Sequence, residues 1–203
     1  MAKPTWLTVT PDSGSGDGTL TNTGLEHTGR VLRTGTVTVT ADEVSGSKTY
    51  TVNQEPKPEF CSFDNGASMS VSKDGGTVTV SGKSNSKALT FSFVGSANNV
   101  TLPTTYTAGG ASTNNGVAIT GDPGATAQYS FSILLSVPKN TTIEAITRTL
   151  KVTNGASVSA QITLNQTAGE AYLTLSETSI TLPYSGTPAV SVTVSSNTSW
   201  TVS

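Results

Sequence analysis

The residue types that most often build active sites and covalent staples are scarce in this sequence. Only one cysteine and one histidine occur among its 203 residues. The chain therefore cannot form an internal disulfide, and a zinc site or a serine–histidine–aspartate triad would lack the side chains that it needs. We expect no enzymatic activity, no cofactor and no metal, and a fold that depends on core packing alone.

Charge is scarce as well. Charged residues make up 12% of the chain, the formal net charge is −2, and the lysines and arginines are scattered. A nucleic-acid-binding surface needs clustered positive charge against the phosphate backbone, so we expect no nucleic-acid partner. The carboxylates fall mostly in turns, which gives little support to a glycosidase pair.

Long apolar runs are missing too. No stretch approaches the ~18 residues of a membrane-spanning helix, and the opening "MAKPTWLTVT" lacks the apolar region of a signal peptide. For the sequence as it stands we expect a soluble protein that has no membrane partner and is not exported by the signal-peptide route.

Threonine, serine, glycine and valine are abundant instead, which favours strands and turns and predicts an all-β protein. Apolar and polar residues alternate with period two in nine segments, as in strands with one buried face. Clusters such as "DSGSGDG", "KDGG" and "TNGAS" separate them and predict turns. This spacing is typical of a β-sandwich. The segments are 34–40, 48–54, 76–82, 89–94, 129–137, 148–153, 161–166, 172–176 and 189–196.

Two patterns occur twice along the chain. "RTGTVTVTADEVSGSKTYTVNQ" (33–54) is similar to "RTLKVTNGASVSAQITLNQ" (148–166), and we call each a back half. "SMSVSKDGGTVTVSGKSN" (68–85) is similar to "SITLPYSGTPAVSVTVSSN" (179–197), and we call each a front half. The order along the chain is back, front, back, front.

This order predicts three segments. Residues 55–170 contain a front and a back half and form a complete middle domain with its flanking linkers. Residues 1–54 are a back half alone, and residues 171–203 are a front half alone. We expect these two terminal segments to complement each other, because each would otherwise leave strand edges unpaired.

Strand alternation also predicts which side chains face the core of the middle domain, since a register slip of one residue would invert every face. The predicted core residues are Phe91, Phe93, Phe131, Ile133, Leu150, Val152, Ile162 and Leu164.

The terminal segments resemble the BACON domains, which are immunoglobulin-like β-sandwiches. The resemblance rests on "NTSW" (197–200), "WLTVTPDSG" (6–14), "RTGTVTVT" (33–40) and "TVNQ" (51–54). It implies one complete sandwich and one assembled from residues 1–54 and 171–203, with Trp6, Trp200 and Val202 in the shared core. The front half comes either from the same chain, folded back, or from a neighbouring copy. The prolines of the 55–59 linker favour the neighbouring copy, because they favour an extended linker over a tight reversal.

BACON domains are common in proteins of gut Bacteroidetes and of their phages. The resemblance, together with the missing signal peptide, favours a phage virion structural protein: a capsid auxiliary or decoration protein, made in the host cytoplasm and located in the virion. Its partners would be other capsid proteins and copies of itself. The alternative is a secreted carbohydrate-binding or adhesion module, whose ligands would be host-surface glycans.

The remaining candidate sites lie in loops. Segment 100–128 is long and polar, and we expect it to be a surface-binding loop through Tyr106, Asn114 and Asn115. A calcium ion held by Asp12, Asp17 and Asp122 is a weaker alternative to ordinary aspartate–glycine turns. We expect His27 to lie in a solvated loop and Cys61 to be a small buried apolar residue.

Overall fold

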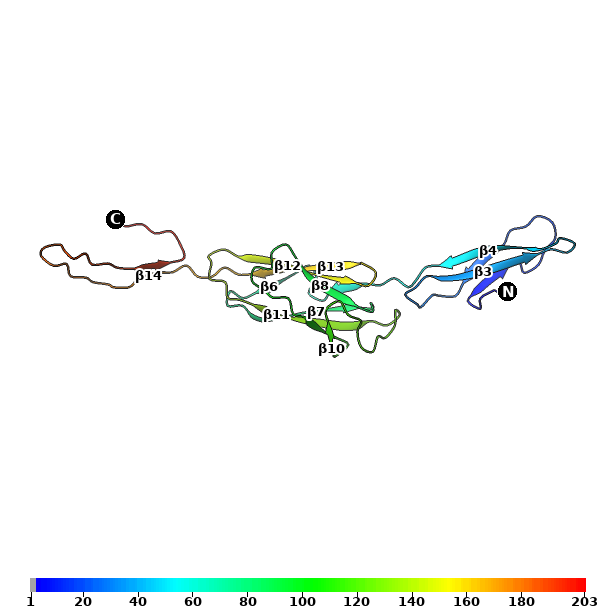
Figure 1. The fold of residues 1–203 in the computed structure, drawn as a ribbon, viewed down its shortest axis with the longest axis horizontal. Helices are drawn as coiled ribbons and strands as arrows, with labels where there is room; N and C mark the ends of the chain where they lie inside the picture. Colours follow the sequence, from blue (N-terminus) through cyan, green and yellow to red (C-terminus); the bar gives the residue numbers. More distant parts are fainter. Residues whose placement is uncertain (1–2) are drawn as a thin grey trace.

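The computed structural model describes residues 3–203, and this part of the chain contains β-strands and no helix. Three units follow one another along an elongated molecule, with the N-terminal unit at one end, the middle domain in the centre and the C-terminal segment at the other end (Figure 1). Because the described residues form no helix, none of them provides a helix that could span a membrane.

The middle domain is a sandwich of two sheets. One sheet has the strand order β10-β9-β11-β7-β5, and the other has the order β6-β13-β12-β8. These orders correspond to the two sheets of an immunoglobulin-like sandwich, so the all-β, immunoglobulin-like fold is confirmed. The strands are β5 (Cys61–Phe63), β6 (Ser68–Val71), β7 (Gly76–Ser84), β8 (Leu89–Val94), β9 (Thr105–Ala108), β10 (Ala111–Asn114), β11 (Tyr129–Val137), β12 (Ile146–Asn154) and β13 (Ser159–Gln166).

The core of this domain lies between the two sheets, where the alternating apolar residues meet. Phe131 is at its centre, with its ring 5.9 Å from the ring of Phe63 and 5.5 Å from that of Phe91. Of the predicted core residues, Phe93 is partly buried against this core and the other seven are at most 2% exposed. The predicted strand faces are therefore confirmed.

The N-terminal unit consists of two hairpins. Strand β1 (Leu7–Thr10) pairs with β2 (Thr21–Gly24), and β3 (Arg33–Thr40) pairs with β4 (Ser47–Gln54). Its core is small: Leu7, Val9 and Val37 are buried, and Trp6, Tyr50 and Val52 pack against them only partly buried.

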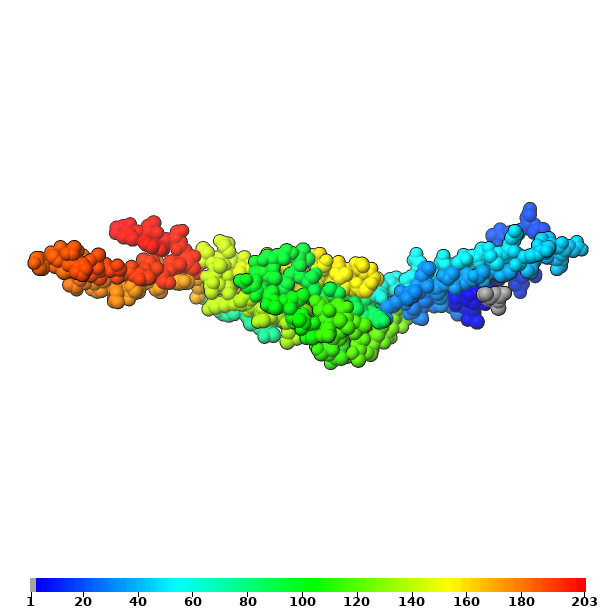
Figure 2. Space-filling model, viewed as in Figure 1, coloured from blue at the N-terminus to red at the C-terminus, as the bar shows by residue number. Residues whose placement is uncertain are grey.

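The C-terminal segment has a single short ladder between β14 (Leu173–Leu175) and β15 (Val194–Ser196), joined by a long excursion of the chain. In the space-filling view it is a thin arm beside the much thicker middle domain (Figure 2). All of residues 171–203 are described, and none of them is buried. This segment therefore has a strand ladder but no hydrophobic core of its own.

Candidate functional site

The two front halves have the same local structure. In the middle domain β5 pairs with β7 so that Cys61 lies opposite Ser84. In the C-terminal segment β14 pairs with β15 so that Leu173 lies opposite Ser196. The sequence repeat aligns Ser84 with Ser196, so the pairing follows the repeat residue by residue.

Serine side chains make the same bond in both front halves. The hydroxyl of Ser84 donates to the carbonyl of Phe60 at 2.7 Å, and the hydroxyl of Ser196 donates to the carbonyl of Tyr172 at 2.9 Å. Each hydroxyl also accepts a backbone N–H from two residues further on. These bonds hold the residue before β5 or β14 against the strand with which β5 or β14 pairs.

The next residue, an asparagine, repeats its contacts as well. Asn85 accepts the N–H of Phe60 at 2.8 Å, and Asn197 accepts the N–H of Tyr172 at 3.0 Å. Their side-chain amides donate to the carbonyls of Pro58, at 3.0 Å, and Glu170, at 2.8 Å. The C-terminal segment is thus folded locally as a front half even though its apolar side chains are uncovered.

The two back halves share an arginine–glutamine bond. Arg33 donates through Nε to Oε1 of Gln54 at 3.0 Å, and Arg148 donates through Nη1 to Oε1 of Gln166 at 2.9 Å. Arg33 lies opposite Gln54, whereas Arg148 lies opposite Leu164, two residues before Gln166. A shift of two residues leaves every side chain on its original face, so the back halves also correspond.

With its flanking strands, the front half of the middle domain spans residues 60–94 and the back half spans residues 129–166, and three strand pairings join them. Strand β6 runs parallel to β13, β7 is antiparallel to β11, and β8 is antiparallel to β12. Gln166 adds a side-chain link, because its Nε2 donates to Pro138 O at 2.8 Å and to Ser72 O, just after β6, at 3.2 Å.

In the N-terminal unit the corresponding edges are open. Within residues 3–203, β3 and β4 pair only with each other, and β1 and β2 do likewise. The Nε2 of Gln54 donates to the carbonyl of Leu25 at 2.9 Å, inside its own unit. No described residue therefore takes the place that β6 has in the middle domain.

The front half at the other end exposes the side chains that the middle domain buries. Leu175 and Leu182 are 54% and 58% exposed, whereas Phe63 and Val71, at the same places in the repeat, are 7% and 5% exposed. Soluble proteins seldom leave a contiguous apolar face uncovered, and such faces mark interaction surfaces.

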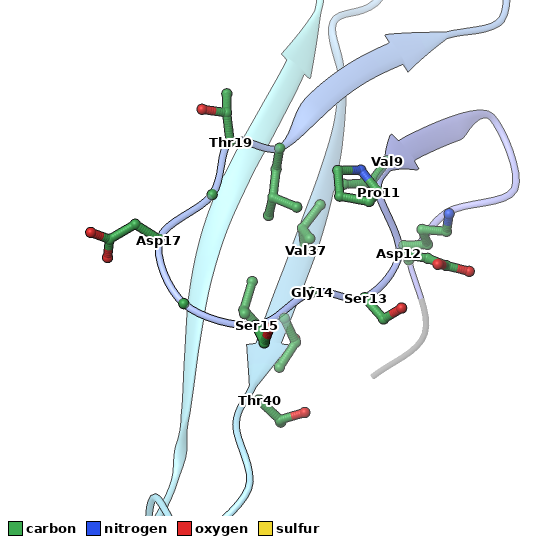
Figure 3. Close-up of a pocket in the computed structure, with 16 residues that line it drawn as sticks. Val9, Pro11, Asp12, Ser13, Gly14, Ser15, Asp17, Thr19, Val37 and Thr40 are labelled. Atoms are coloured by element: carbon green, nitrogen blue, oxygen red, sulfur yellow. The ribbon is translucent and has the colours of Figure 1, made fainter.

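A hollow of about 660 Å³ lies over the back half of the N-terminal unit. The loop that follows β1 encircles it, with Val9 and Val37 toward the middle and Asp17 pointing away (Figure 3). Leu20 and Val39, 38% and 43% exposed, complete its apolar lining. The exposed apolar side chains at this hollow are thus Leu20 and Val39, which lie over the buried Val9 and Val37.

The predicted pairing core is divided between the two ends of the chain. Trp6 is half-buried in the N-terminal unit, with the guanidinium of Arg33 4.6 Å from its ring centroid. Trp200 is 51% exposed and Val202 87% exposed in the C-terminal segment. Because the middle domain separates the two segments (Figure 1), these residues do not share a core within one described chain.

The prediction that Tyr106 lies on a binding surface is wrong. Tyr106 belongs to β9, is 3% exposed and packs its ring 5.0 Å from that of Phe91. Its hydroxyl accepts the N–H of Leu89 at 3.3 Å. The reason is that "TYTAGGASTN" forms a hairpin, β9–β10, that adds to the sandwich and turns this side chain inward.

The two asparagines of that segment have different positions. Asn115 is half-buried and mimics a strand, because its amide accepts the N–H of Phe91 at 2.7 Å and donates to its carbonyl at 3.0 Å. Asn114 is exposed at the end of β10. Of the three predicted loop residues, only Asn114 is thus exposed.

The structure does not bring the aspartates of the calcium alternative together. Asp122 is engaged by Arg30 of the N-terminal unit, and Asp12 and Asp17 lie on opposite sides of the loop in Figure 3. His27 is half-buried in its loop, with Nε2 2.7 Å from the carbonyl oxygen of Val31. Cys61 is buried as predicted, and burial raises the pKa of its thiol.

A contact that sequence reasoning missed fixes the junction between the first two units. Arg30 donates to both carboxylate oxygens of Asp122, at 2.5 and 2.8 Å, and to the carbonyl of Asn85. Its Nε lies 3.2 Å from Glu59. Sequence alone gave no signal for this contact, because it depends on how two units meet.

The linkers on the two sides of the middle domain make a similar backbone hydrogen bond. Lys57 N donates to Gly29 O at 2.8 Å, and Gly169 N donates to Thr142 O at 2.7 Å. The repeat aligns Lys57 with Gly169, so each linker leaves the preceding back half in a similar way.

No model of a protein family matches the sequence, and no curated protein matches it significantly. The BACON resemblance therefore stays a prediction. Similar solved structures include domains 4–9 of the surface layer protein SbsC (14% identity, TM-score 0.36, 87% of this chain and 33% of that chain). Another contains cadherin domains 1–5 of protocadherin gamma B2 (10% identity, TM-score 0.40, 98% of this chain and 39% of that chain). A third contains the titin domains Z1Z2 in complex with telethonin (18% identity, TM-score 0.30, 82% of this chain and 74% of that chain). The chain spans about a third of the length of the first two.

Proposed function

We propose that this protein is a structural component of a phage virion, an auxiliary or decoration protein of the capsid that works through assembly. The observation that carries the proposal is the pair of open half-sandwiches at the two ends of the chain, each a set of two-stranded sheets with exposed apolar side chains. Exposed strand edges and apolar faces of this kind are used for pairing with other chains.

The likeness of the terminal segments to BACON domains, found in phages of gut Bacteroidetes, supports the virion as the setting. The alternative, a module that binds host-surface glycans, loses its main candidate contact, because Tyr106 is buried. Trp6 belongs to the N-terminal unit and Trp200 to the C-terminal segment, and these lie at opposite ends of the molecule (Figure 1), so the two rings cannot stack on one sugar within a described chain.

Mass spectrometry and immunogold labelling of purified particles and of host envelope and secreted fractions test this proposal. We expect the protein in the particle fraction at many copies per particle, with label on the head. Recovery from the envelope or secreted fraction alone, together with selective binding on a glycan array, would support the glycan-binding alternative and overturn the virion proposal.

A further inference from the structure

We propose that residues 171–203 of one copy complete the back half formed by residues 3–54 of the next copy, so that copies join head to tail. Each terminal sandwich is then built from two chains. This inference deepens the proposed function by naming the partner as a second copy of the chain, and it stands on the structure whether or not the assembly belongs to a virion.

The middle domain provides the template for the contact. There Ser68–Val71 pairs in parallel with Thr163–Gln166, placing Met69 opposite Leu164 and Val71 opposite Gln166. The repeat aligns "SMSV" with "SITL" (179–182) and "TLNQ" with "TVNQ" (51–54). The predicted seam is therefore parallel, with Ile180 opposite Val52, Thr181 opposite Asn53, and Leu182 opposite Gln54.

The glutamine at this seam has the same arginine partner as its counterpart in the middle domain. Gln54 is held through Oε1 by Arg33, as Gln166 is held by Arg148. In the middle domain the free end of the amide, Nε2, reaches the carbonyl of Ser72. The repeat aligns Ser72 with Pro183, whose carbonyl accepts the second N–H of Gln54 Nε2 in the shared sandwich, the first being donated to Leu25 O.

The two apolar faces are complementary in kind. Leu175, Ile180 and Leu182 are 54%, 41% and 58% exposed on the front half. On the back half Leu20 and Val39, 38% and 43% exposed, line the hollow above the buried Val9 and Val37. Packing one against the other removes both faces from water and pairs the open strand edges, which is the arrangement that the middle domain shows.

A second copy is favoured over the same chain because the C-terminal segment is fastened to the far end of the middle domain. Asn197 donates through Nδ2 to the carbonyl of Thr141 at 3.1 Å, and Glu170, the linker residue just before the segment, forms an ion pair with Lys73. Residues 171–203 therefore point away from the N-terminal unit (Figure 1). Folding back would break these contacts, whereas a neighbouring copy can bind without disturbing them.

Such a contact joins different surfaces on the two partners and is heterologous. Heterologous contacts form a ring when the rotation between copies closes, and a filament when it does not. The similar backbone bond at both linkers favours a regular array in which complete and shared sandwiches alternate.

Disulfide crosslinking at the predicted register tests the contact. Asn53 and Thr181 are exposed and predicted to lie opposite each other, within the ~7 Å that a disulfide requires between Cα atoms. One chain carries Asn53→Cys and another carries Thr181→Cys. We expect the oxidised mixture to give a crosslinked dimer that neither chain gives alone, and the double variant to give a ladder of higher species.

The matched control replaces Asn53→Cys with Thr49→Cys, on the same face of β4 but four residues away, about 13 Å along the strand. It should give at most a tenth of the crosslinked product. An internal crosslink in the monomeric double variant would show that the chain folds back, and no crosslink in any combination would show that the halves do not pair; either result overturns the proposal. A monomeric protein found in virions would overturn this inference and leave the proposed function standing.

Discussion

Arg148 and Gln166 meet across the back half of the middle domain, with Nη1 of the arginine 2.9 Å from Oε1 of the glutamine and both residues at most 2% exposed. The arginine also donates to the carbonyls of Ala97 and Asn98. The glutamine donates through Nε2 to the carbonyl of Ser72, which belongs to the front half. One buried pair thus ties together both halves of the sandwich.

Gln166→Ala should destabilise the middle domain by about 3 kcal/mol, because it leaves part of a buried guanidinium and the carbonyls after β6 without their partner. Chemical denaturation of the full chain measures this as a lower unfolding midpoint. Gln54→Ala is the matched variant at the other copy of the repeat. It should leave the unfolding of the middle domain unchanged and weaken association between copies; equal effects on domain unfolding would contradict the assignment.

Leu182→Lys should weaken head-to-tail association by about 30-fold, the equivalent of about 2 kcal/mol of lost leucine burial. Sedimentation equilibrium measures the change. Tyr184→Lys, two residues on at a fully exposed position, is the control, since the repeat aligns Tyr184 with Lys73 of the middle domain. The control should associate like the unaltered chain, and a comparable loss in both variants would mean that added charge alone causes the effect.

Arg30→Gln should loosen the junction between the N-terminal unit and the middle domain. The arginine lowers the pKa of Asp122 through their hydrogen bond, so its ionised form favours the docked arrangement. This contribution is present above the ordinary pKa of an aspartate and is lost as the pH falls through the lowered value. Small-angle scattering in the Leu182→Lys background should show a broader range of shapes for Arg30→Gln at neutral pH.

The same loosening should occur in the Leu182→Lys chain in acid and be absent near neutrality. If the scattering profile of Arg30→Gln matches that of its parent at both pH values, the ion pair does not hold the junction.

Alkaline conditions should destabilise the middle domain through Tyr129. Burial raises its pKa to about 12, and its hydroxyl donates to the carbonyl of Ser86. Because the folded pKa lies above the unfolded value of about 10, the contribution to stability is complete below pH ~10 and is lost as the pH rises toward 12. Denaturation midpoints measured across this pH range give the loss of stability. Tyr129→Phe should remove most of the dependence of the midpoint on pH. If that dependence is unchanged in Tyr129→Phe, a group other than Tyr129 causes it.

Period-two alternation was sufficient to predict the core of the middle domain, because long strands with one buried face leave a clear pattern, as around Phe131 and Leu150. Alternation does not predict the burial of Tyr106, because its strand is only four residues long and lies within a long polar segment. The Gly109–Gly110 pair is the signal for a hairpin in this segment, since both glycines have positive φ in the two-residue turn between β9 and β10.

The junction contacts of Arg30 could not have been predicted in the same way. They join residues up to 92 positions apart in sequence, and nothing in either local pattern indicates how the two units meet. The repeat, by contrast, indicates the front and back halves directly. The serine and asparagine of the front halves and the arginine and glutamine of the back halves align in the sequence, and they make the same hydrogen bonds in both copies.

The central claim is that the two open halves of different copies complete each other, and the mass of the 203-residue chain in solution tests it most directly. Sedimentation velocity over a hundredfold range of concentration should show whole-number multiples of the 20.7 kDa chain. The population should shift toward larger species as concentration rises, or remain a single closed ring of fixed mass. A single 20.7 kDa species at every concentration would contradict the account.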